Sequence, residues 1–135
     1  MQYKKKRKKN GDEEIYYRAM KDAHYKTLET TDRMPPSNKE TFISPTLEYV
    51  QSYEGIIVEF ALEKGTTSAL AAIGVRDESP LVKATYPDMR PIFSGWKKSR
   101  AFFKEEDGQI NIGLGNGRAL EIFNDGIVSF DKVAR

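Results

Sequence analysis

One arginine of the chain has the type and setting of an anion-binding residue. Arg18 lies in EIYYRAM (14–20), whose alternation and β-rich composition predict a strand. A guanidinium presents a fixed fork of donors to phosphate or carboxylate oxygens. Arg18 is therefore a candidate anion clamp. The alternative is an edge-strand arginine that extends its charged end to solvent.

A serine–proline–threonine step, Ser44-Pro45-Thr46, ends the short predicted strand TFIS (41–44). Ser44 is suited to be the N-cap of a helix predicted over 45–53, because its hydroxyl can accept a bond from a first-turn amide. Pro45 then stands at the first helical position, where its missing N–H costs nothing. Whether the hydroxyls also contact a ligand depends on partners elsewhere in the chain.

A glutamate near the C-terminus is the candidate carboxylate. Glu121 lies in RALEIF (118–123), where we predict a strand with Ala119 and Phe123 on the same face. That arrangement would direct the carboxylate into a half-apolar cleft. The alternative is an ordinary carboxylate on an edge strand.

The glycine-rich stretch GLGNGR (113–118) invites a comparison with phosphate-binding loops. It lacks the spacing of a dinucleotide-binding loop and the Lys-Ser or Lys-Thr ending of a P-loop, and it leads into a predicted strand. We therefore predict a hairpin turn here.

The predicted elements alternate between strands and short helices and then become β-rich. Besides those named above, we predict a helix over 22–31, a loop over 32–40 and a central, doubly buried strand over 56–62. The region 63–98 reads as irregular, with an ordered piece only at 72–76. Further strands are predicted over 100–106, 109–114 and 126–133. The fold class expected from this order is α+β, with a small mixed β-sheet core and short helices.

Composition limits the chemistry. The chain has 135 residues, no cysteine and one histidine, His24, so disulfides, thiolate metal sites and a two-histidine ribonuclease pair are excluded. The run KKKRKK (4–9) carries six positive charges, and we expect 1–13 to be a disordered linker before a single domain over 14–135. Without that run the remaining chain is net acidic. No stretch approaches the length of a membrane span.

The order of these motifs resembles the ADP-ribosyltransferase fold, in its Arg–Ser–Glu branch. That branch has an arginine on its first core strand, a serine step at a strand–helix junction and a glutamate on a late strand. The matching residues are Arg18, the Ser44–Thr46 step and Glu121, with Phe130 as the aromatic that follows the turn. The resemblance covers about 14–62 and 117–133.

The resemblance implies an enzyme that cleaves the nicotinamide–ribose bond of NAD and transfers ADP-ribose to a protein or RNA. It implies Glu121 as the catalytic carboxylate and Arg18, Ser44 and Thr46 as NAD-binding residues, without a metal. Members that modify arginine carry a second acidic residue two positions before the glutamate, and Ala119 stands there. Arginine is therefore not the expected acceptor.

The setting implied is that of a C-terminal effector domain of a bacterial polymorphic toxin. Such a domain would be delivered into the cytoplasm of a target cell and would have a cognate immunity protein as a partner. Two other classes stay open. One is a metal-independent ribonuclease toxin, with lysine or arginine for the phosphate and Glu, Tyr or His24 as proton carriers. The other is a non-catalytic binding module.

Overall fold

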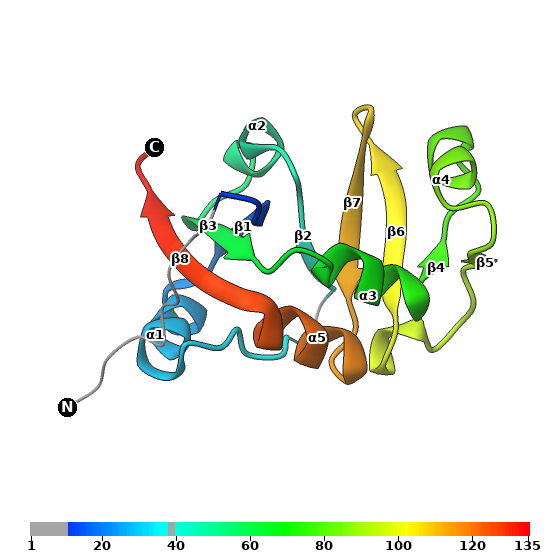
Figure 1. Ribbon diagram of the computed structural model, residues 1–135. Coiled ribbons are helices and arrows are strands. Elements are labelled where there is room, and N and C mark those ends of the chain that lie inside the picture. The colour runs from blue at the N-terminus through cyan, green and yellow to red at the C-terminus, as the bar shows by residue number, and fades with distance from the viewer. Residues whose placement is uncertain (1–10, 38–39) are drawn as a thin grey trace.

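The computed structural model describes residues 11–37 and 40–135, so that residues 1–10 of the linker expected over 1–13 lie outside the described residues. Two β-sheets and several short helices form the α+β fold that the sequence predicts (Figure 1). The strands are β1 (Glu14–Met20), β2 (Thr41–Ile43), β3 (Ile56–Leu62), β4 (Val75–Arg76), β5 (Arg90–Pro91), β6 (Ala101–Glu106), β7 (Gln109–Leu114) and β8 (Ile127–Val133). The helices are α1 (Asp22–Thr31), α2 (Leu47–Gln51), α3 (Thr66–Ala72), α4 (Pro80–Thr85), the 3-10 turn η1 (Trp96–Lys98) and α5 (Arg118–Gly126).

The smaller sheet has three antiparallel strands in the order β1-β3-β8. Its central strand β3 has the residue range that the sequence predicts, and Ile57, Val58 and Phe60 are fully or almost fully buried. Side chains that point to either face of the sheet are covered, because β3 has a neighbouring strand on each side and packed layers on both faces. The β-branched run at 56–62 therefore predicted both the strand and its central place.

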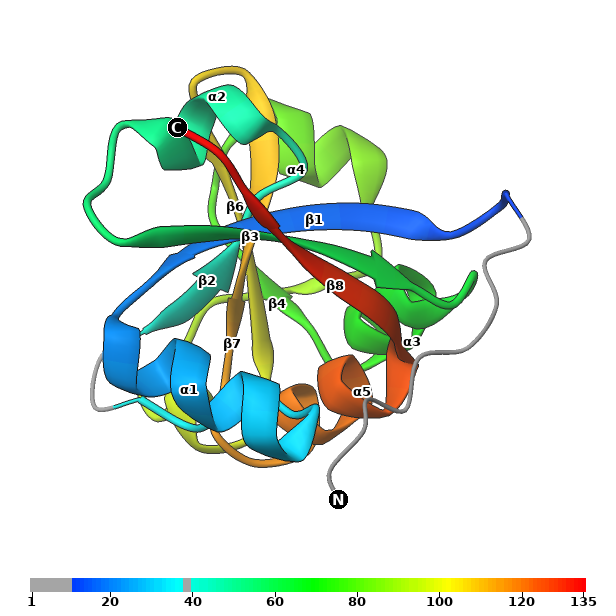
Figure 2. The same cartoon turned by 90° about the vertical axis from the view of Figure 1, so that its left-hand side faces the viewer.

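The larger sheet has five strands in the order β2-β7-β6-β4-β5. β7 is antiparallel to β2 and β6, whereas β4 is parallel to β6 and β5. The strands of the smaller sheet cross in front of it (Figure 2). The sheets meet at one bridge, in which Tyr17 N–H donates to Ser44 O at 2.7 Å and Ser44 N–H donates to Tyr17 O at 3.0 Å.

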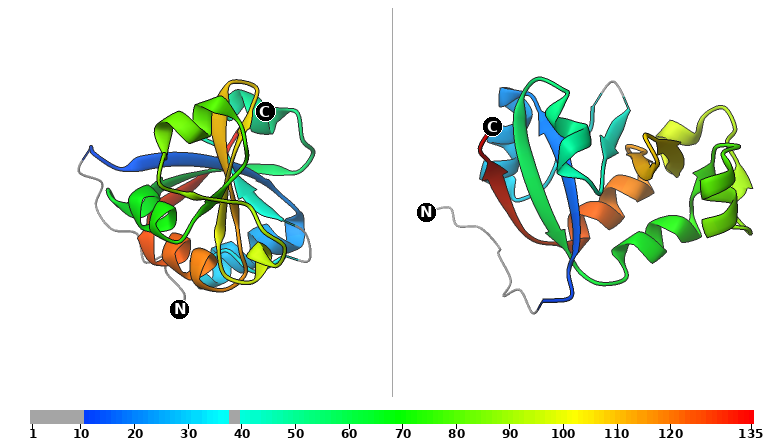
Figure 3. Two further views of the ribbon diagram at one scale, coloured as in Figure 1. Left: turned by 90° about the vertical axis from the view of Figure 1, so that its right-hand side faces the viewer. Right: turned by 90° about the horizontal axis from the view of Figure 1, so that it is seen from above.

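Aromatic and aliphatic side chains fill the space between the sheets and the paired helices α3 and α5. Phe60 of β3 packs edge-on against Phe123 of α5, with the ring centroids 5.0 Å apart. Burying a side chain of this size contributes about 1.5–3 kcal/mol to folding. α4 and β5 lie at the end of the molecule far from β8 (Figure 3).

The prediction of a strand over 118–123 is wrong, because this stretch forms the first part of α5. Ala119, Leu120 and Phe123 are buried at helical spacing, one turn apart on the face that packs against the core. The hairpin predicted for GLGNGR is wrong for the same reason, since the glycines lead from β7 into this helix. Gly115 and Gly117 lie so close to the backbone of Arg100 and Lys98 that no Cβ would fit.

The middle of the chain is more ordered than predicted. It contains the two short helices α3 and α4, and side-chain oxygens accept hydrogen bonds from backbone amides at the start of each helix. The Glu14 carboxylate of β1 accepts bonds from the amides of Gly65 and Thr67 at the start of α3, at 2.7 and 2.8 Å. Ser79 caps α4, with Pro80 at its first position. Helices of six or seven residues give too short a periodic pattern to be recognised from sequence.

Candidate functional site

A cavity of about 410 Å³ opens where β1, the start of α1, α2 and β2 come together. This volume is within the range of small-molecule sites. The polar and aromatic residues that matter for its chemistry are Arg18, His24, Glu40, Phe42 and Tyr53.

Arg18 lies in this cavity and is half-buried. Its Nη1 donates to the Phe42 carbonyl at 2.9 Å, and within the described part of the chain the guanidinium has no ion pair. Burial lowers the pKa of Arg18 to about 10, although the nearby Glu40 charge acts in the opposite direction. A desolvated cation with unused donors is a favourable place for an oxyanion. The sequence-based role of anion clamp stays a prediction.

Ser44 is fully buried at the junction of the two sheets. The predicted N-cap is wrong by two residues, because α2 begins at Leu47 and its N-cap is Thr46. The bridge to Tyr17 keeps Ser44 in an extended conformation. Its hydroxyl accepts a bond from Thr46 N–H at 3.3 Å and one from Gln109 Nε2 at 2.8 Å.

The side-chain amide of Gln109, the first residue of β7, forms hydrogen bonds through both its nitrogen and its oxygen. Its Nε2 donates to Ser44 and to Asn111 Oδ1 at 2.9 Å, while its Oε1 accepts from Thr46 Oγ1 at 2.5 Å. Thr46, which the resemblance implies as an NAD-binding residue, thus orients Gln109. Whether Ser44 or Thr46 also contacts a ligand stays a prediction.

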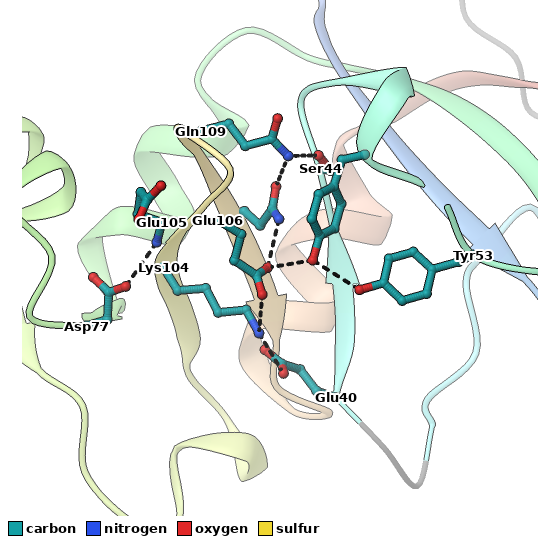
Figure 4. Close-up of polar contacts among 10 residues, drawn as sticks. Glu40, Ser44, Tyr53, Asp77, Lys104, Glu105, Glu106 and Gln109 are labelled. Carbon is teal, nitrogen blue, oxygen red and sulfur yellow. Dashed lines mark hydrogen bonds and ion pairs between the residues drawn. The ribbon is translucent and has the colours of Figure 1, made fainter. Parts of the chain in front are cut away.

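Glu106 stands at the end of this chain of contacts (Figure 4). Its Oε1 accepts bonds from the buried Asn111 Nδ2 at 2.8 Å and from the Tyr49 hydroxyl at 3.0 Å. The Glu106 side chain keeps 34% of its surface exposed, whereas Ser44 and Asn111 have none. One oxygen of the Glu106 carboxylate is thus held by neutral donors, and the partial exposure of the side chain leaves the group accessible to a substrate.

Lys104 links this carboxylate to the cavity. Its Nζ donates to Glu40 Oε1 at 3.1 Å and lies 3.9 Å from Glu106 Oε2. The Glu40 carboxylate fits only because position 113 is glycine, since a Cβ there would lie 2.2 Å from Glu40 Oε2. Lys104 therefore carries one positive charge between two carboxylates.

Three rings cover this group of polar residues on the α2 side. Phe42, Tyr49 and Tyr53 pack with centroids 5.6–5.9 Å apart, and the two tyrosine hydroxyls lie 3.1 Å from one another. Burial raises the pKa of Tyr49, and its bonds with Tyr53 and Glu106 raise it further. Tyr49 thus remains a neutral donor to Glu106.

Glu121 has a different environment from the one predicted. It lies in the first turn of α5, its side chain is 63% exposed, and its Oε1 lies 3.2 Å from Arg118 Nη1. Neither Glu121 nor Glu106 is among the described residues that line the Arg18 cavity, but Glu106 is connected to it through Lys104 and Glu40. The structure therefore brings Arg18 and Ser44 to one region and leaves Glu121 on the outside of a helix.

Sequence reasoning missed Glu106, Gln109, Asn111 and Tyr49. A signal was present, because each of the predicted strands 100–106 and 109–114 carries two polar residues two positions apart, Lys104 and Glu106 on the first and Gln109 and Asn111 on the second. Lys104 and Glu106 on β6 therefore lie on the same face as Gln109 and Asn111 on β7. Polar residues that share one face of two neighbouring strands indicate a candidate site on that face.

No group of three or more His, Asp and Glu side chains in 11–37 and 40–135 is arranged to hold a metal ion. No helix in the same residues is long and apolar enough to cross a membrane.

The sequence was compared with known families and proteins. Residues 12–132 match the model of a family described as the PT3 toxin domain. No curated protein matches the chain. The matched residues include every strand and helix of the fold except the last residue of β8.

Proposed function

The chain belongs to the PT3 toxin domain family, and from this premise we propose that it is a delivered effector that cleaves the nicotinamide–ribose bond of NAD and transfers ADP-ribose to a macromolecule. Its expected place of action is the cytoplasm of a target cell. A cognate immunity protein that covers the cavity is the expected partner.

The proposal rests mainly on the proximity of Arg18 and Ser44. They are 26 positions apart in the numbering, and the Tyr17–Ser44 bridge places them on neighbouring strands. The Arg–Ser–Glu resemblance requires this neighbourhood between its first strand and its serine step. Gln109 then extends the contact from Ser44 toward a carboxylate.

That carboxylate, in our proposal, is Glu106. The resemblance asks for a glutamate on a late strand beside the serine step, and Glu106 lies on β6 and reaches Ser44 through Asn111 and Gln109. Glu121, the candidate from the sequence, lies on an exposed helix face.

The proposed reaction uses these side chains as follows. Arg18 binds pyrophosphate or ribose oxygens and fixes the conformation of NAD. The bond between the nicotinamide nitrogen and ribose C1′ breaks, and its electron pair leaves with neutral nicotinamide. The growing positive charge on the ribose is stabilised by Glu106, in the manner of glycoside hydrolysis. A nucleophile of the acceptor then bonds to C1′, and its proton can pass to Glu106.

A ribonuclease is the second candidate, because Arg18 and His24 line one cavity with Glu40, and Lys104 lies between Glu40 and Glu106. Burial lowers the pKa of His24, and the charges of Arg18 and Lys21 lower it further. A neutral His24 could accept the proton of a ribose hydroxyl at neutral pH.

One experiment separates these activities. The protein is incubated with NAD labelled in the adenosine part, with and without cell lysate, and with labelled RNA in the absence of NAD. Release of nicotinamide together with labelled macromolecules supports the transferase, and nicotinamide release alone indicates a glycohydrolase. Cleavage of RNA without NAD would replace the proposal by the ribonuclease.

A further inference from the structure

The segment from Arg90 to Arg100, here called the basic–aromatic loop, combines positive charge with exposed apolar side chains. Residues 89–103 contain four cations, Arg90, Lys97, Lys98 and Arg100, and no carboxylate. The whole chain has a net charge of only +2, so this concentration of charge is local. Arg90, Lys97 and Lys98 are exposed.

The apolar side chains of this loop are exposed as well. Ile92 and Phe93 keep 41% and 43% of their surface, and the loop borders an open hollow of about 590 Å³ lined by residues 92–98. The Arg100 guanidinium carbon lies 5.4 Å from the centre of the Phe93 ring, which is a cation–π distance. The loop thus presents a flat ring with a guanidinium beside it.

The loop is connected with the candidate site. Trp96 packs against Phe102, with ring centroids 5.1 Å apart, and Lys104 Nζ lies 5.7 Å from the centre of the Phe102 ring. The same Nζ lies 5.5 Å from the centre of the Phe42 ring, which lines the Arg18 cavity. A ligand bound on the loop could therefore extend over Phe102 to the cavity.

We propose that the basic–aromatic loop binds a single-stranded nucleic acid. Proteins that hold single strands combine a line of cations for the phosphates with aromatic rings on which the bases stack. The exposed Phe93 ring supplies the stacking surface. The cations are supplied by Lys97, Lys98 and Arg100. Each nucleotide of a single strand supplies one phosphate and one flat base, which matches this pairing of cations with an exposed ring.

If the proposed transferase activity is correct, this strand is the acceptor of ADP-ribose, and that extension rests on the proposed function. The binding itself does not depend on NAD. Failure of NAD cleavage and failure of nucleic-acid binding are therefore separate results.

The test measures binding of the full chain to a fluorescein-labelled 12-nucleotide RNA of mixed sequence, by anisotropy, at several salt concentrations without NAD. Lys97→Gln/Lys98→Gln is compared with Lys26→Gln/Lys64→Gln, which removes two exposed lysines elsewhere. The run 4–9 is present in every variant and contributes equally to each.

We expect the Lys97/Lys98 variant to bind about tenfold more weakly, with a salt slope reduced by roughly 0.7 for each lost phosphate contact. Phe93→Ala should lower affinity by about tenfold with an unchanged slope, because it removes stacking and no charge. Melting curves check that each variant is folded.

Equal affinities of the two lysine variants would overturn the proposal, and so would wild-type affinity of Phe93→Ala. Displacement of the RNA by polyglutamate at equal charge concentration would assign the loop to an acidic protein partner. With adenosine-labelled NAD present, transfer of label to the RNA that falls in the Lys97/Lys98 variant would identify the strand as acceptor.

Discussion

The side-chain amide of Gln109 donates to the buried hydroxyl of Ser44 at 2.8 Å, and this contact joins the β6–β7 hairpin to the junction of the two sheets. The hairpin carries Glu106, and the junction carries Arg18 on the neighbouring strand. The geometry of the candidate site thus depends on a hydrogen bond between residues 65 positions apart.

Ser44→Ala should lower the turnover of NAD by about tenfold and change its affinity little. The variant removes one of two acceptors of Gln109 Nε2, so the amide and the Asn111–Glu106 contact behind it lose their fixed orientation. Steady-state rates of nicotinamide release give the split between turnover and KM. Thr46→Ser, which keeps the hydroxyl on Gln109 Oε1, is the control and should stay near the wild-type rate. An unchanged rate in Ser44→Ala would show that Ser44 does not position the site.

Arg18→Ala should weaken NAD binding by about ten- to a hundredfold, because it removes charged hydrogen bonds from a partly desolvated place. Arg18→Lys keeps the charge but loses the fork of donors, so its affinity should be intermediate. The pKa of about 10 keeps Arg18 protonated at pH 7–8, so its contribution should not vary there. Calorimetric titration with NAD measures this, and equal affinity of wild type and Arg18→Ala would exclude the anion clamp.

Asn124→Ala should lower the free energy of unfolding by about 2–3 kcal/mol, since two buried backbone groups would lose their partners. Asn124 binds both the N–H and the C=O of Met34, at 2.8 and 3.0 Å, and so fixes the loop that leads to Glu40. Asn116, at the other end of α5, contacts Ser37 in the same way but is exposed. Asn116→Ala should cost less than about 1 kcal/mol. Urea unfolding compares the two variants, and equal losses would contradict the role of burial.

Tyr16 should make the protein less stable at alkaline pH. Its burial raises the pKa to about 12 from about 10 in the unfolded chain. The folded state favours the neutral phenol, so this contribution is complete below pH 10 and is lost as the pH rises toward 12. The full shift corresponds to about 2–3 kcal/mol. Tyr16→Phe lacks this titration, so the free energy of unfolding of the wild type should fall relative to that of Tyr16→Phe from pH 9 to pH 11. A constant difference would show that the phenol titrates normally.

Much of the fold could be read from the sequence where a pattern was long. The β-branched run of β3 and the alternating β7 gave correct strands, and α1 was correct at both ends. RALEIF was misread because Ile and Phe favour strands while the spacing of the apolar residues favours a helix, and the packing against Phe60 decides between the two.

The candidate site could be predicted only in part. Arg18 and Ser44 were found because each belongs to a local motif. Glu106 was not, since its partners Tyr49 and Asn111 come from α2 and from the neighbouring strand. Such convergence is set by strand register and helix placement, which a single sequence does not specify.

We propose that Glu106, and not Glu121, is the carboxylate that stabilises the ribosyl transition state. The most direct measurement is the rate of nicotinamide release and the NAD affinity for Glu106→Gln and Glu121→Gln. Glu106→Gln should lower turnover by about a hundredfold or more with NAD binding kept, because the interaction strengthens in the transition state. Glu121→Gln, a change on an exposed helix face, should release nicotinamide at the wild-type rate. A wild-type rate for Glu106→Gln, or a large loss confined to Glu121→Gln, would contradict this account.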